Sequence, residues 1–513
     1  MQKLLIHTFS HFFIVYLKDL RFTSIVYEFT HRFVDWKEEY DPTTRQYVKK
    51  PRVWAGRLAD NSLFRFPIGA LPEFLSFCQA KGVFKNEVEY KNELIYYPAP
   101  ANFVLNSNYT LRQSQVEALD YTESQRIMGR PSVLISMPPG TGKTVTFCKY
   151  LAMRGLRAGM VVAPTYMEKW QADVKHYLDL EDEDFYVVTG GKSIRKAVDL
   201  CKTGDFNYKF ILISLRTFAN FMKQYEASPA ATIDEYGTDP ISFWETLQIG
   251  VLGADEAHEQ FHAMCWMHTF IHGVFHVALT ATMINSDPHI ERMQKIAYPA
   301  NIRFDNIKMK RYIAMINVEY RFATFDKDKI KTSFPRNSSY NQNAFEASIY
   351  KNKKVLKNWL EMVGWAVDTF FLHKTYQKGD KLGIYFARIE MLNVVVAYLQ
   401  MKYPHLDIRR FAESDPYVNI IEPDIRVTTQ GSGGTGKDIK SLTTVLNFNV
   451  MKTVTGNTQL LGRIREIEGR DDLFFVQFGC TNIKKHVSYK LDRDNDFRDK
   501  TKSITNRYYG VNL

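Results

Sequence analysis

The segment from Met137 to Thr144, MPPGTGKT, constrains the fold of this chain more than any other feature. It directly follows an apolar run at 132–137 and precedes a helical pattern. Glycines at such a turn let backbone N–H groups point inward around phosphate oxygens, and the N-terminus of the following helix adds a favourable dipole. A lysine then supplies positive charge for the β and γ phosphates, and a hydroxyl supplies a ligand for Mg²⁺. The segment therefore predicts a phosphate-binding loop, although Met137 stands where the general pattern has glycine; its members are Pro139, Gly140, Thr141, Gly142, Lys143 and Thr144.

Short apolar runs alternate with helical patterns through most of the chain. Such runs, rich in β-branched residues and separated by helices, indicate strands of a parallel α/β sheet. The first set lies at 132–137, 159–164, 209–214, 249–254 and 276–281. The second set lies at 381–387, 424–429, 443–449 and 473–478, after a helix expected at 350–372. The polar segment 227–239 is expected to loop out, and 336–343 to connect two lobes.

These patterns predict an α/β chain with two tandem parallel-sheet lobes behind a small α+β domain. The expected domains are 1–105 at the N-terminus, 106–305 for the nucleotide-binding lobe, 306–480 for the second lobe and 481–513 for a charged tail. Within the first domain, the run at 12–16 is expected to be a strand and 71–80 a short helix.

A second chemical signal is DEAH, from Asp255 to His258, at the end of the run 249–254. Two carboxylates delivered by a buried strand suit metal-assisted hydrolysis. Asp255 is expected to hold Mg²⁺ through water, as a metal ligand beside Thr144. Glu256 is expected to orient and activate the attacking water, and His258 to face the second lobe.

The order of motifs resembles that of superfamily 2 helicases. LRQSQVEAL at 111–119 looks like their adenine-recognition segment, with Arg112 and Gln115. Later segments look like motifs Ia to VI of the family, at 163–170, 213–218, 279–282, 382–387, 434–442 and 459–466. The resemblance implies two RecA-like lobes, ATP and Mg²⁺ as cofactors, and ATP hydrolysis that drives movement on nucleic acid.

The same resemblance implies roles for individual residues of these motifs. Thr280 and Thr282 of motif III are expected to couple hydrolysis to movement of the lobes. Further nucleotide contacts are expected from Gly436, Asp438 and Gln459. Contacts to the nucleic-acid strand are expected from Pro164, Thr165, Arg216, Thr217 and Thr428. GTGK at 434–437 is not a second phosphate loop, because Asp438 follows it instead of Ser or Thr.

Motif VI departs from the family pattern of two arginines three positions apart. The first arginine is Arg463, but Glu466 occupies the second position and Arg465 stands one residue earlier. An arginine finger stabilises charge on a transferring phosphate. Arg463 is expected to be that finger, with Arg465 either as an alternative finger or as a solvent-facing side chain.

The N-terminal region resembles that of phage recombination helicases, on the segments 7–14 and 51–71. Such motors unwind and reanneal branched DNA, regress forks and migrate Holliday junctions, so the resemblance implies this role and a domain that recognises branched DNA. Arg52, Trp54 and Arg57 combine cationic and aromatic surface suited to phosphate and to an exposed base. The alternative is a tryptophan packed in a small core with solvated arginines.

Composition agrees with a polyanionic partner, because the net charge is +11. The apolar fraction of 45% excludes global disorder. Five scattered cysteines without a CxxC pair argue against a structural zinc site and for a reducing compartment. The uncharged stretch 4–17 is too short to span a bilayer. We therefore expect a soluble cytoplasmic protein, in the host cytoplasm if the source is a phage, that acts on DNA.

Two other functions are compatible with the motifs. The core motifs of the family contact the sugar-phosphate backbone of the nucleic acid, and such contacts do not distinguish DNA from RNA. An RNA-directed motor or a transcript-release helicase is therefore one alternative. The unusual motif VI leaves open a second alternative, an ATP-dependent switch that binds nucleic acid without translocating.

Overall fold

The computed structural model describes the chain except residues 1–2, 18–19, 42–45, 84–86, 93–96, 139, 258–260, 282–286, 306–310, 324–328, 335–338, 413–414, 417, 434–438 and 451–453. The described residues form two compact units, one made mainly of residues 1–307 and the other mainly of residues 308–513. Among them, no helix is both long and apolar enough to cross a membrane.

The first unit is built on a seven-stranded sheet in which every neighbouring pair of strands is parallel. The spatial order is β10-β11-β9-β12-β13-β8-β14. The bounds are β8 (Ser132–Ser136), β9 (Ala158–Val162), β10 (Phe185–Val188), β11 (Phe210–Ser214), β12 (Val251–Ala254), β13 (Phe275–Thr280) and β14 (Arg303–Phe304). All five apolar runs expected in this region are strands. β10 and β14 were not predicted, because runs of four and two residues are too short to show a periodic pattern.

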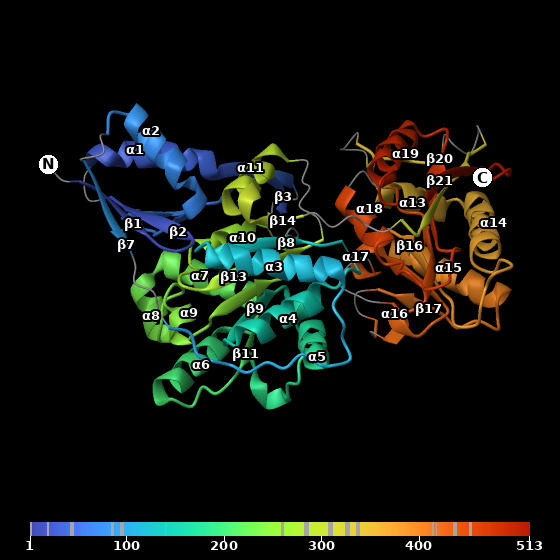
Figure 1. Ribbon diagram of the computed structural model, residues 1–513. Helices are drawn as coiled ribbons and strands as arrows, with labels where there is room; N and C mark the ends of the chain where they lie inside the picture. Colours follow the sequence, from blue (N-terminus) through green and yellow to red (C-terminus); the bar gives the residue numbers. More distant parts are fainter. Residues whose placement is uncertain are drawn as a thin grey trace. The chain divides into compact units, whose positions relative to one another are not determined.

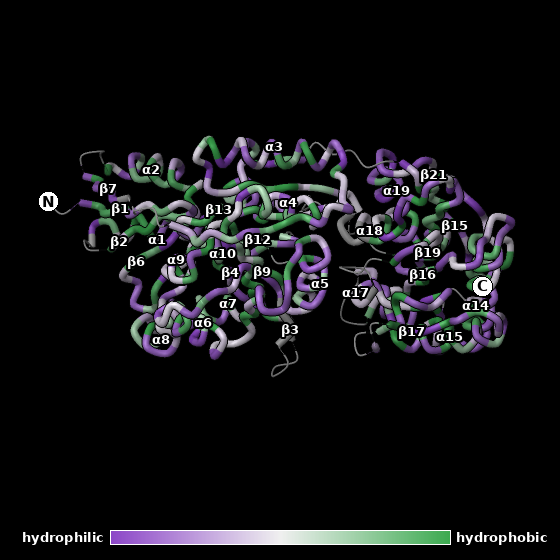
Figure 2. Tube along the Cα trace, turned by 60° about the horizontal axis from the view of Figure 1, so that its bottom comes forward, coloured by the Kyte–Doolittle hydropathy of each residue, from purple (hydrophilic) through white to green (hydrophobic). Residues whose placement is uncertain are grey.

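Helices cover both faces of this sheet (Figure 1). The helices are α3 (Gln113–Ile127), α4 (Lys143–Arg154), α5 (Met167–Tyr177), α6 (Gly191–Thr203), α7 (Leu215–Ala227), α8 (Pro229–Tyr236), α9 (Phe243–Thr246), α10 (Phe261–His268) and α11 (Pro288–Ala297). Side chains alternate between the two faces of the sheet, so each strand contributes to a hydrophobic core on both faces. Leu212 of β11 belongs to the buried cluster with α3, α4 and α5, whereas Ile211 and Ile213 belong to the cluster with α6, α7 and α10. In Figure 2 the tube of α3 carries both hydrophilic and hydrophobic colour, and its buried residues include Gln115, Thr122 and Gln125 besides Ala118 and Leu119.

The segment 227–239 is not the loop that its polarity suggested. It forms α8, with Pro229 in the first turn and Gly237 at φ +76° after the last. The buried side chains of Thr232 and Tyr236 hold this helix on the unit, so tertiary packing outweighs the polar composition.

The N-terminal region has its own five-stranded mixed sheet, in the order β5-β6-β2-β1-β7. Its strands are β1 (Leu4–Thr8), β2 (Phe12–Tyr16), β5 (Gly56–Arg57), β6 (Leu63–Pro67) and β7 (Val88–Asn92). Helices α1 (Leu20–Thr30) and α2 (Leu71–Ala80) accompany it, and β3 (Val34–Asp41) pairs with β4 (Gln46–Val53) in a separate hairpin.

The core of this region is shared with the first seven-stranded sheet. Phe13, Phe66 and Trp54 belong to the same buried cluster as Leu134 of β8 and Tyr298 after α11. The 1–105 region and the nucleotide-binding lobe therefore form one compact unit, with no solvated gap between their cores.

The second unit is built on another seven-stranded, wholly parallel sheet, in the order β17-β18-β16-β19-β20-β15-β21. Its strands are β15 (Ala314–Tyr320), β16 (Lys381–Phe386), β17 (Ile408–Phe411), β18 (Ile425–Thr429), β19 (Leu442–Asn447), β20 (Phe474–Cys480) and β21 (Ser503–Tyr508). Its helices are α13 (Gln342–Lys351), α14 (Lys353–Phe370), α15 (Ile389–Lys402), α16 (Val418–Ile421), α17 (Gln430–Gly433), α18 (Val454–Leu461) and α19 (Lys484–Phe497). The predicted fold class, two parallel-sheet lobes with a small mixed N-terminal sheet, is confirmed.

Three details of the second unit differ from the expectations. The segment 336–343 does not join the lobes, because β15 before it and α13 after it already pack in the core of the second unit. The helix expected at 350–372 is divided at Asn352, whose side chain caps α14 by accepting from N of Val355. Residues 481–513 are no separate tail, because they form α19 and β21, and β21 pairs with β15.

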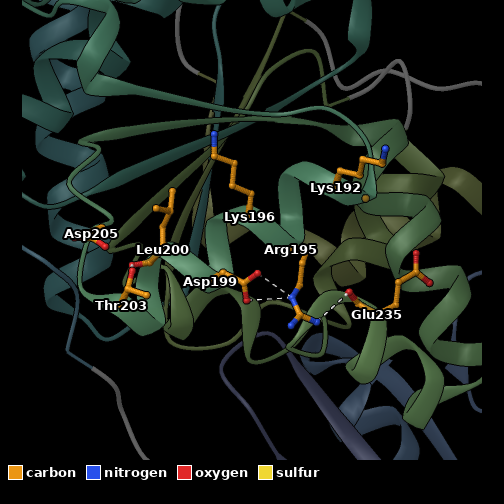
Figure 3. Close-up of a pocket in the computed structure, with 9 residues that line it drawn as sticks. Lys192, Arg195, Lys196, Asp199, Leu200, Thr203, Asp205 and Glu235 are labelled. Carbon is orange, nitrogen blue, oxygen red and sulfur yellow. Dashed lines mark hydrogen bonds and ion pairs between the residues drawn. The ribbon is translucent and has the colours of Figure 1, made fainter.

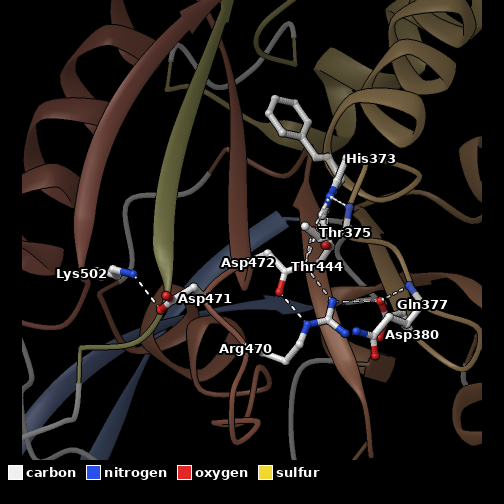
Figure 4. A network of polar contacts seen from close by, with 10 residues as sticks. His373, Thr375, Gln377, Asp380, Thr444, Arg470, Asp471, Asp472 and Lys502 are labelled. Carbon is white, nitrogen blue, oxygen red and sulfur yellow. Dashed lines mark hydrogen bonds and ion pairs between the residues drawn. The ribbon is translucent and has the colours of Figure 1, made fainter.

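A polar network ties together the segments that lead into β16 and β20 (Figure 4). The guanidinium of Arg470 bonds to the carboxylates of Asp380 and Asp472, and Thr375 donates to Asp472. The Arg470 and Asp380 side chains are only 10% and 8% exposed. Hydrogen bonds from Arg470 lower the pKa of Asp472 to about 2, so the pair is ionised at neutral pH.

Candidate nucleotide and nucleic-acid site

The phosphate loop runs from the end of β8 to the start of α4. Gly140 and Gly142 adopt φ values of +81° and +91°, a left-handed conformation that favours glycine. A Cβ atom on Gly142 would lie 2.1 Å from Nε2 of Gln115, so a side chain has no room there. Thr146 donates from Oγ1 to the carbonyl of Gly142 at 2.9 Å and fixes the first turn of the helix. The backbone geometry of the described loop residues is compatible with the predicted phosphate-binding loop, which stays a prediction.

Gln115 links the start of α3 to this loop. Its Nε2 donates to the carbonyl of Thr141 at 3.0 Å, and its Oε1 accepts from N of Arg112 at 2.8 Å. The side chain is buried, whereas Arg112 is exposed. In this structure the Gln115 amide holds the loop; adenine recognition by Gln115 and Arg112 stays a prediction.

Asp255 and Glu256 follow β12 beside the loop. Asp255 accepts from Trp170 Nε1 at 2.8 Å and from N of Glu256 at 2.9 Å, so both of its oxygens are oriented. Glu256 has φ +47°, a strained conformation for a non-glycine residue. Its Oε1 lies 3.6 Å from Nζ of Lys143. The structure therefore brings together a cation and both predicted carboxylates.

The residues fit a nucleotide with a divalent cation. Burial, together with the nearby charge of Glu256, raises the pKa of Asp255, although Lys143 opposes the shift. A divalent cation would offset these buried negative charges. Thr144, at the start of α4, is partly exposed and available as the hydroxyl ligand. Trp170 was not among the predicted site residues; its only sequence signal was its position at the end of the motif Ia segment.

Thr280 lies at the end of β13, between the loop and the carboxylates. Its carbonyl accepts from N of Met137 at 2.9 Å, and the carbonyl of Leu279 accepts from N of Ala257 at 3.1 Å. One strand end is thus bonded both to the start of the phosphate loop and to the residue after Glu256. This connection agrees with a coupling role for Thr280, which stays a prediction.

The predicted strand-contacting residues of the first unit follow β9 and β11. Pro164 and Thr165 are exposed in a short 3-10 turn after β9, and Arg216 is exposed in the first turn of α7. Thr217 accepts from N of Gly190 at 2.8 Å, which joins the start of α6 to the same edge. Carboxyl ends of parallel strands share one edge of a sheet, and ligands bind there in open α/β folds. Gly190 was missed, since a glycine pair alone is a weak signal.

A pocket of about 570 Å³ lies along α6 (Figure 3). Lys192, Arg195 and Lys196 line it, but Asp199 and Glu235 do so as well. Arg195 forms an ion pair with Asp199 at 3.0 Å and donates a hydrogen bond to the carbonyl of Asp234 at 2.8 Å. The opposed charges in this pocket leave it without a clear preference for a polyanion.

In the second unit, Arg463 and Arg465 follow α18 and are both partly buried. Nη1 of Arg465 donates to the carbonyl of Gly462 at 3.0 Å. Thr428 is fully buried in β18 and donates to the carbonyl of Thr429. The prediction that Thr428 contacts DNA is therefore wrong, because the side chain faces the protein interior.

Several predicted residues lie outside the described part of the chain, namely Pro139, His258, Thr282, Gly436 and Asp438. Gln459 lies in α18, but its side chain is not among those described.

The prediction for Trp54 is wrong, and the packed-core alternative is correct. Trp54 is fully buried, donates from Nε1 to Asp35 Oδ1 at 3.1 Å, and meets the ring of His262 edge-on with centroids 4.8 Å apart. Arg52 is paired with the same Asp35. Arg57 is exposed, and its backbone N donates to Glu226. No base can stack on Trp54.

Comparisons with known proteins found one family model and solved structures of low identity. Residues 108–285 match the family model described as the type III restriction enzyme, res subunit. Many solved structures match, among them the following two at low identity. The crystal structure of T4 UvsW is 12% identical with a TM-score of 0.33, and the alignment covers 99% of this chain and 100% of that one. Saccharomyces cerevisiae Dbp5, bound to RNA and ADP BeF3, is 13% identical with a TM-score of 0.47, over 78% and 94% of the two chains. No curated protein matches the sequence.

Fold and site together define a chain with two parallel-sheet units and a loop whose geometry suits the binding of phosphate. The family match covers the phosphate loop and the DEAH strand, and the remaining motifs follow in the family's order. The family match is to residues 108–285, which lie mainly in the first unit, and does not extend to residues 308–513 of the second unit.

Proposed function

We propose that this chain is a superfamily 2 helicase that remodels branched DNA in replication, recombination and repair, by fork regression, branch migration, and coupled unwinding and annealing. One observation carries the proposal: the N-terminal sheet and the ATP-binding lobe share a core that contains Trp54 and Tyr298. A region joined to the motor in this way moves with it. A junction held by the N-terminal region would then be displaced at every ATP-driven step.

ATP with Mg²⁺ supplies the phosphoryl group whose transfer to water releases the driving free energy. Lys143 places positive charge beside the phosphate cradle, and Glu256 is the base that accepts the proton of the attacking water at its carboxylate. Trp170 and the backbone N of Glu256 hold Asp255 in a fixed orientation as the metal carboxylate. Arg463 is proposed to stabilise charge on the transferring phosphate.

Contact to the DNA backbone is assigned to Pro164, Thr165, Arg216 and Thr217. Their strand-end position allows contact to phosphates, which carries no sequence information. Such phosphate contacts can bind DNA or RNA. The preference for branched DNA must therefore come from the N-terminal region.

The hairpin of β3 and β4 has an exposed aromatic and basic surface, which the buried Trp54 cannot provide. Trp36 on β3 is 64% exposed, and Lys37, Lys49 and Lys50 are exposed on the same two strands. Lys37 is the register partner of Lys50, and Glu38 of Lys49. Side chains alternate between the two faces of a strand, so Trp36 shares its face with Glu38 and Lys49, whereas Lys37 and Lys50 lie on the other face. An exposed indole on a hairpin with ammonium groups on both faces suits an unpaired base and its flanking phosphates at a junction. Trp36 therefore takes the stacking role in this proposal.

The test is strand exchange on a labelled Holliday junction with homologous arms, in the presence of ATP. We expect migration to linear duplexes by the wild-type protein, a strong loss in Trp36→Ala, and no loss in Val48→Ala, a neutral change on β4 of the same hairpin. Absence of ATP-dependent migration by the wild-type protein, alongside active displacement of an RNA strand, would replace this proposal by an RNA-directed motor.

A further inference from the structure

The second unit contains a basic pocket of about 540 Å³ where α13 meets α14. Four lysines and one aromatic ring line it: Lys329, Lys331, Lys351, Lys353 and Phe334. Its volume lies in the range of small-ligand clefts, roughly 300–1,000 Å³. None of the motif residues described above contributes to it.

Hydrogen bonds from backbone N–H groups fix the segments that line this basic pocket. The N of Lys331 donates to Oγ of Ser348 on α13 at 3.1 Å, and N of Asn341 donates to the carbonyl of Thr332 at 2.8 Å. Asn352 divides the two helices and caps α14. The segment with Lys331 and Phe334 is thereby held against the helix junction that carries Lys351 and Lys353.

Three of the lysines that line the basic pocket are exposed cations. Lys331, Lys351 and Lys353 are exposed, and no carboxylate among the described residues forms an ion pair with them. Among the residues that the structure describes, no acidic side chain lines this pocket, in contrast to the pocket along α6. Lys353 also opens α14, whose first turn has no acidic residue, although a helix N-terminus disfavours cations. A bound anion would relieve both the mutual repulsion and the unfavourable dipole.

The basic pocket lies on a helix fastened to the edge of the sheet where motif IV ends. The buried carboxylate of Glu346 on α13 accepts from N of Ala387 at 2.9 Å and from N of Arg388 at 2.8 Å. These two residues directly follow β16. In open parallel sheets this is the edge at which ligands bind. The pocket is therefore placed to extend a nucleic-acid path along the second unit.

We propose that the basic pocket binds a single-stranded segment of nucleic acid, with phosphates on Lys331, Lys351 and Lys353 and one base against Phe334. The inference rests on the proposed function, because it supplies that motor with a strand-holding site outside its motifs. Phe334 is 47% exposed, and an aromatic face stacks on any base. Neutralising phosphates with lysines gives binding that weakens steeply with salt.

The test measures binding of a fluorescent oligothymidylate by anisotropy over a range of salt concentrations. The combined variant Lys331→Ala, Lys351→Ala and Lys353→Ala should bind more weakly and lower the magnitude of the salt slope by about 2, at about 0.7 per phosphate contact. Phe334→Ala should weaken binding at least about 5-fold with an unchanged salt slope, because no charge is removed.

The matched control removes three exposed lysines elsewhere in the same unit, through Lys374→Ala, Lys378→Ala and Lys485→Ala. It should retain the wild-type slope, and all variants should bind a fluorescent ATP analogue as the wild-type protein does. An unchanged slope in the pocket variant, or an equal decrease in the control, would overturn the basic pocket as a strand site. Failure of the wild-type protein to bind any oligonucleotide would instead overturn the proposed function.

Discussion

Nζ of Lys143 lies 3.6 Å from Oε1 of Glu256, which joins the phosphate loop to the carboxylates after β12. The two side chains are only 13% and 19% exposed, so their interaction is poorly screened by solvent. The cation predicted to bind the phosphates and the predicted base therefore lie together in one site.

Lys143→Ala should lower ATP turnover by about 100-fold or more, because it removes the charge that stabilises the transferring phosphate. Nucleic-acid affinity should be retained, since the predicted strand contacts follow other strands. Steady-state ATPase and oligonucleotide anisotropy measure the two effects, with Lys149→Ala on the same helix as the control. Normal turnover in Lys143→Ala would refute the phosphate-loop assignment.

Arg463→Ala should reduce turnover far more than Arg465→Ala. Arg463 occupies the first arginine position of motif VI, whereas Arg465 donates to the carbonyl of Gly462 within its own turn. Comparing kcat of the two variants at saturating ATP separates the roles. The reverse order would move the finger to Arg465.

Alanine at Trp54 should lower the stability of the protein, whereas alanine at Trp36 should weaken DNA binding and leave stability unchanged. Trp54→Ala removes a fully buried side chain from the shared core and should lower the free energy of unfolding by about 3–5 kcal/mol. Trp36→Ala changes an exposed side chain and should leave the urea midpoint unchanged while it weakens binding to junction DNA. If Trp36→Ala binds junctions as well as the wild-type protein does, the hairpin has no stacking role.

Arg470 should contribute to stability in a pH-dependent way. The pKa of Asp472 is lowered to about 2 by hydrogen bonds from Arg470, below the unpaired value of about 3.9. Its stabilising contribution is therefore fully present above about pH 4 and is lost as the pH falls towards 2.

Arg470→Ala should cost about 3 kcal/mol at pH 7, because it leaves two carboxylates without their shared cation. Urea unfolding at several pH values tests this, and Arg498→Ala, a change at an exposed arginine after α19, is the control. A wild-type protein and an Arg470→Ala variant that unfold at the same urea concentration at pH 7 would contradict the role of the network.

The nucleotide site was predictable because its signals are local in sequence. The Gly140 and Gly142 turn, the charge of Lys143 and the carboxylates after β12 each require only a few neighbouring residues. The two parallel sheets were predictable for the same reason, since each long strand is a continuous apolar run.

The remaining features depend on partners distant in sequence. Trp54 is buried because Phe261 and His262 pack on it, about two hundred positions later. β21 is a strand because it pairs with β15, although its own residues are mostly exposed and charged or polar. Thr428 looked like a polar contact but lies in a central strand with its hydroxyl satisfied by the backbone. The amino-acid composition of a short segment cannot predict which distant residues will pack on it.

The most direct test of the central claim is the steady-state ATPase rate measured without nucleic acid and with single-stranded DNA, a model fork, a Holliday junction or duplex RNA. Our account predicts strong stimulation by the fork and the junction, weaker stimulation by the other polymers, and loss of the branched-DNA preference in Trp36→Ala. Preferential stimulation by duplex RNA, or equal rates with and without every polymer, would contradict a motor that remodels branched DNA.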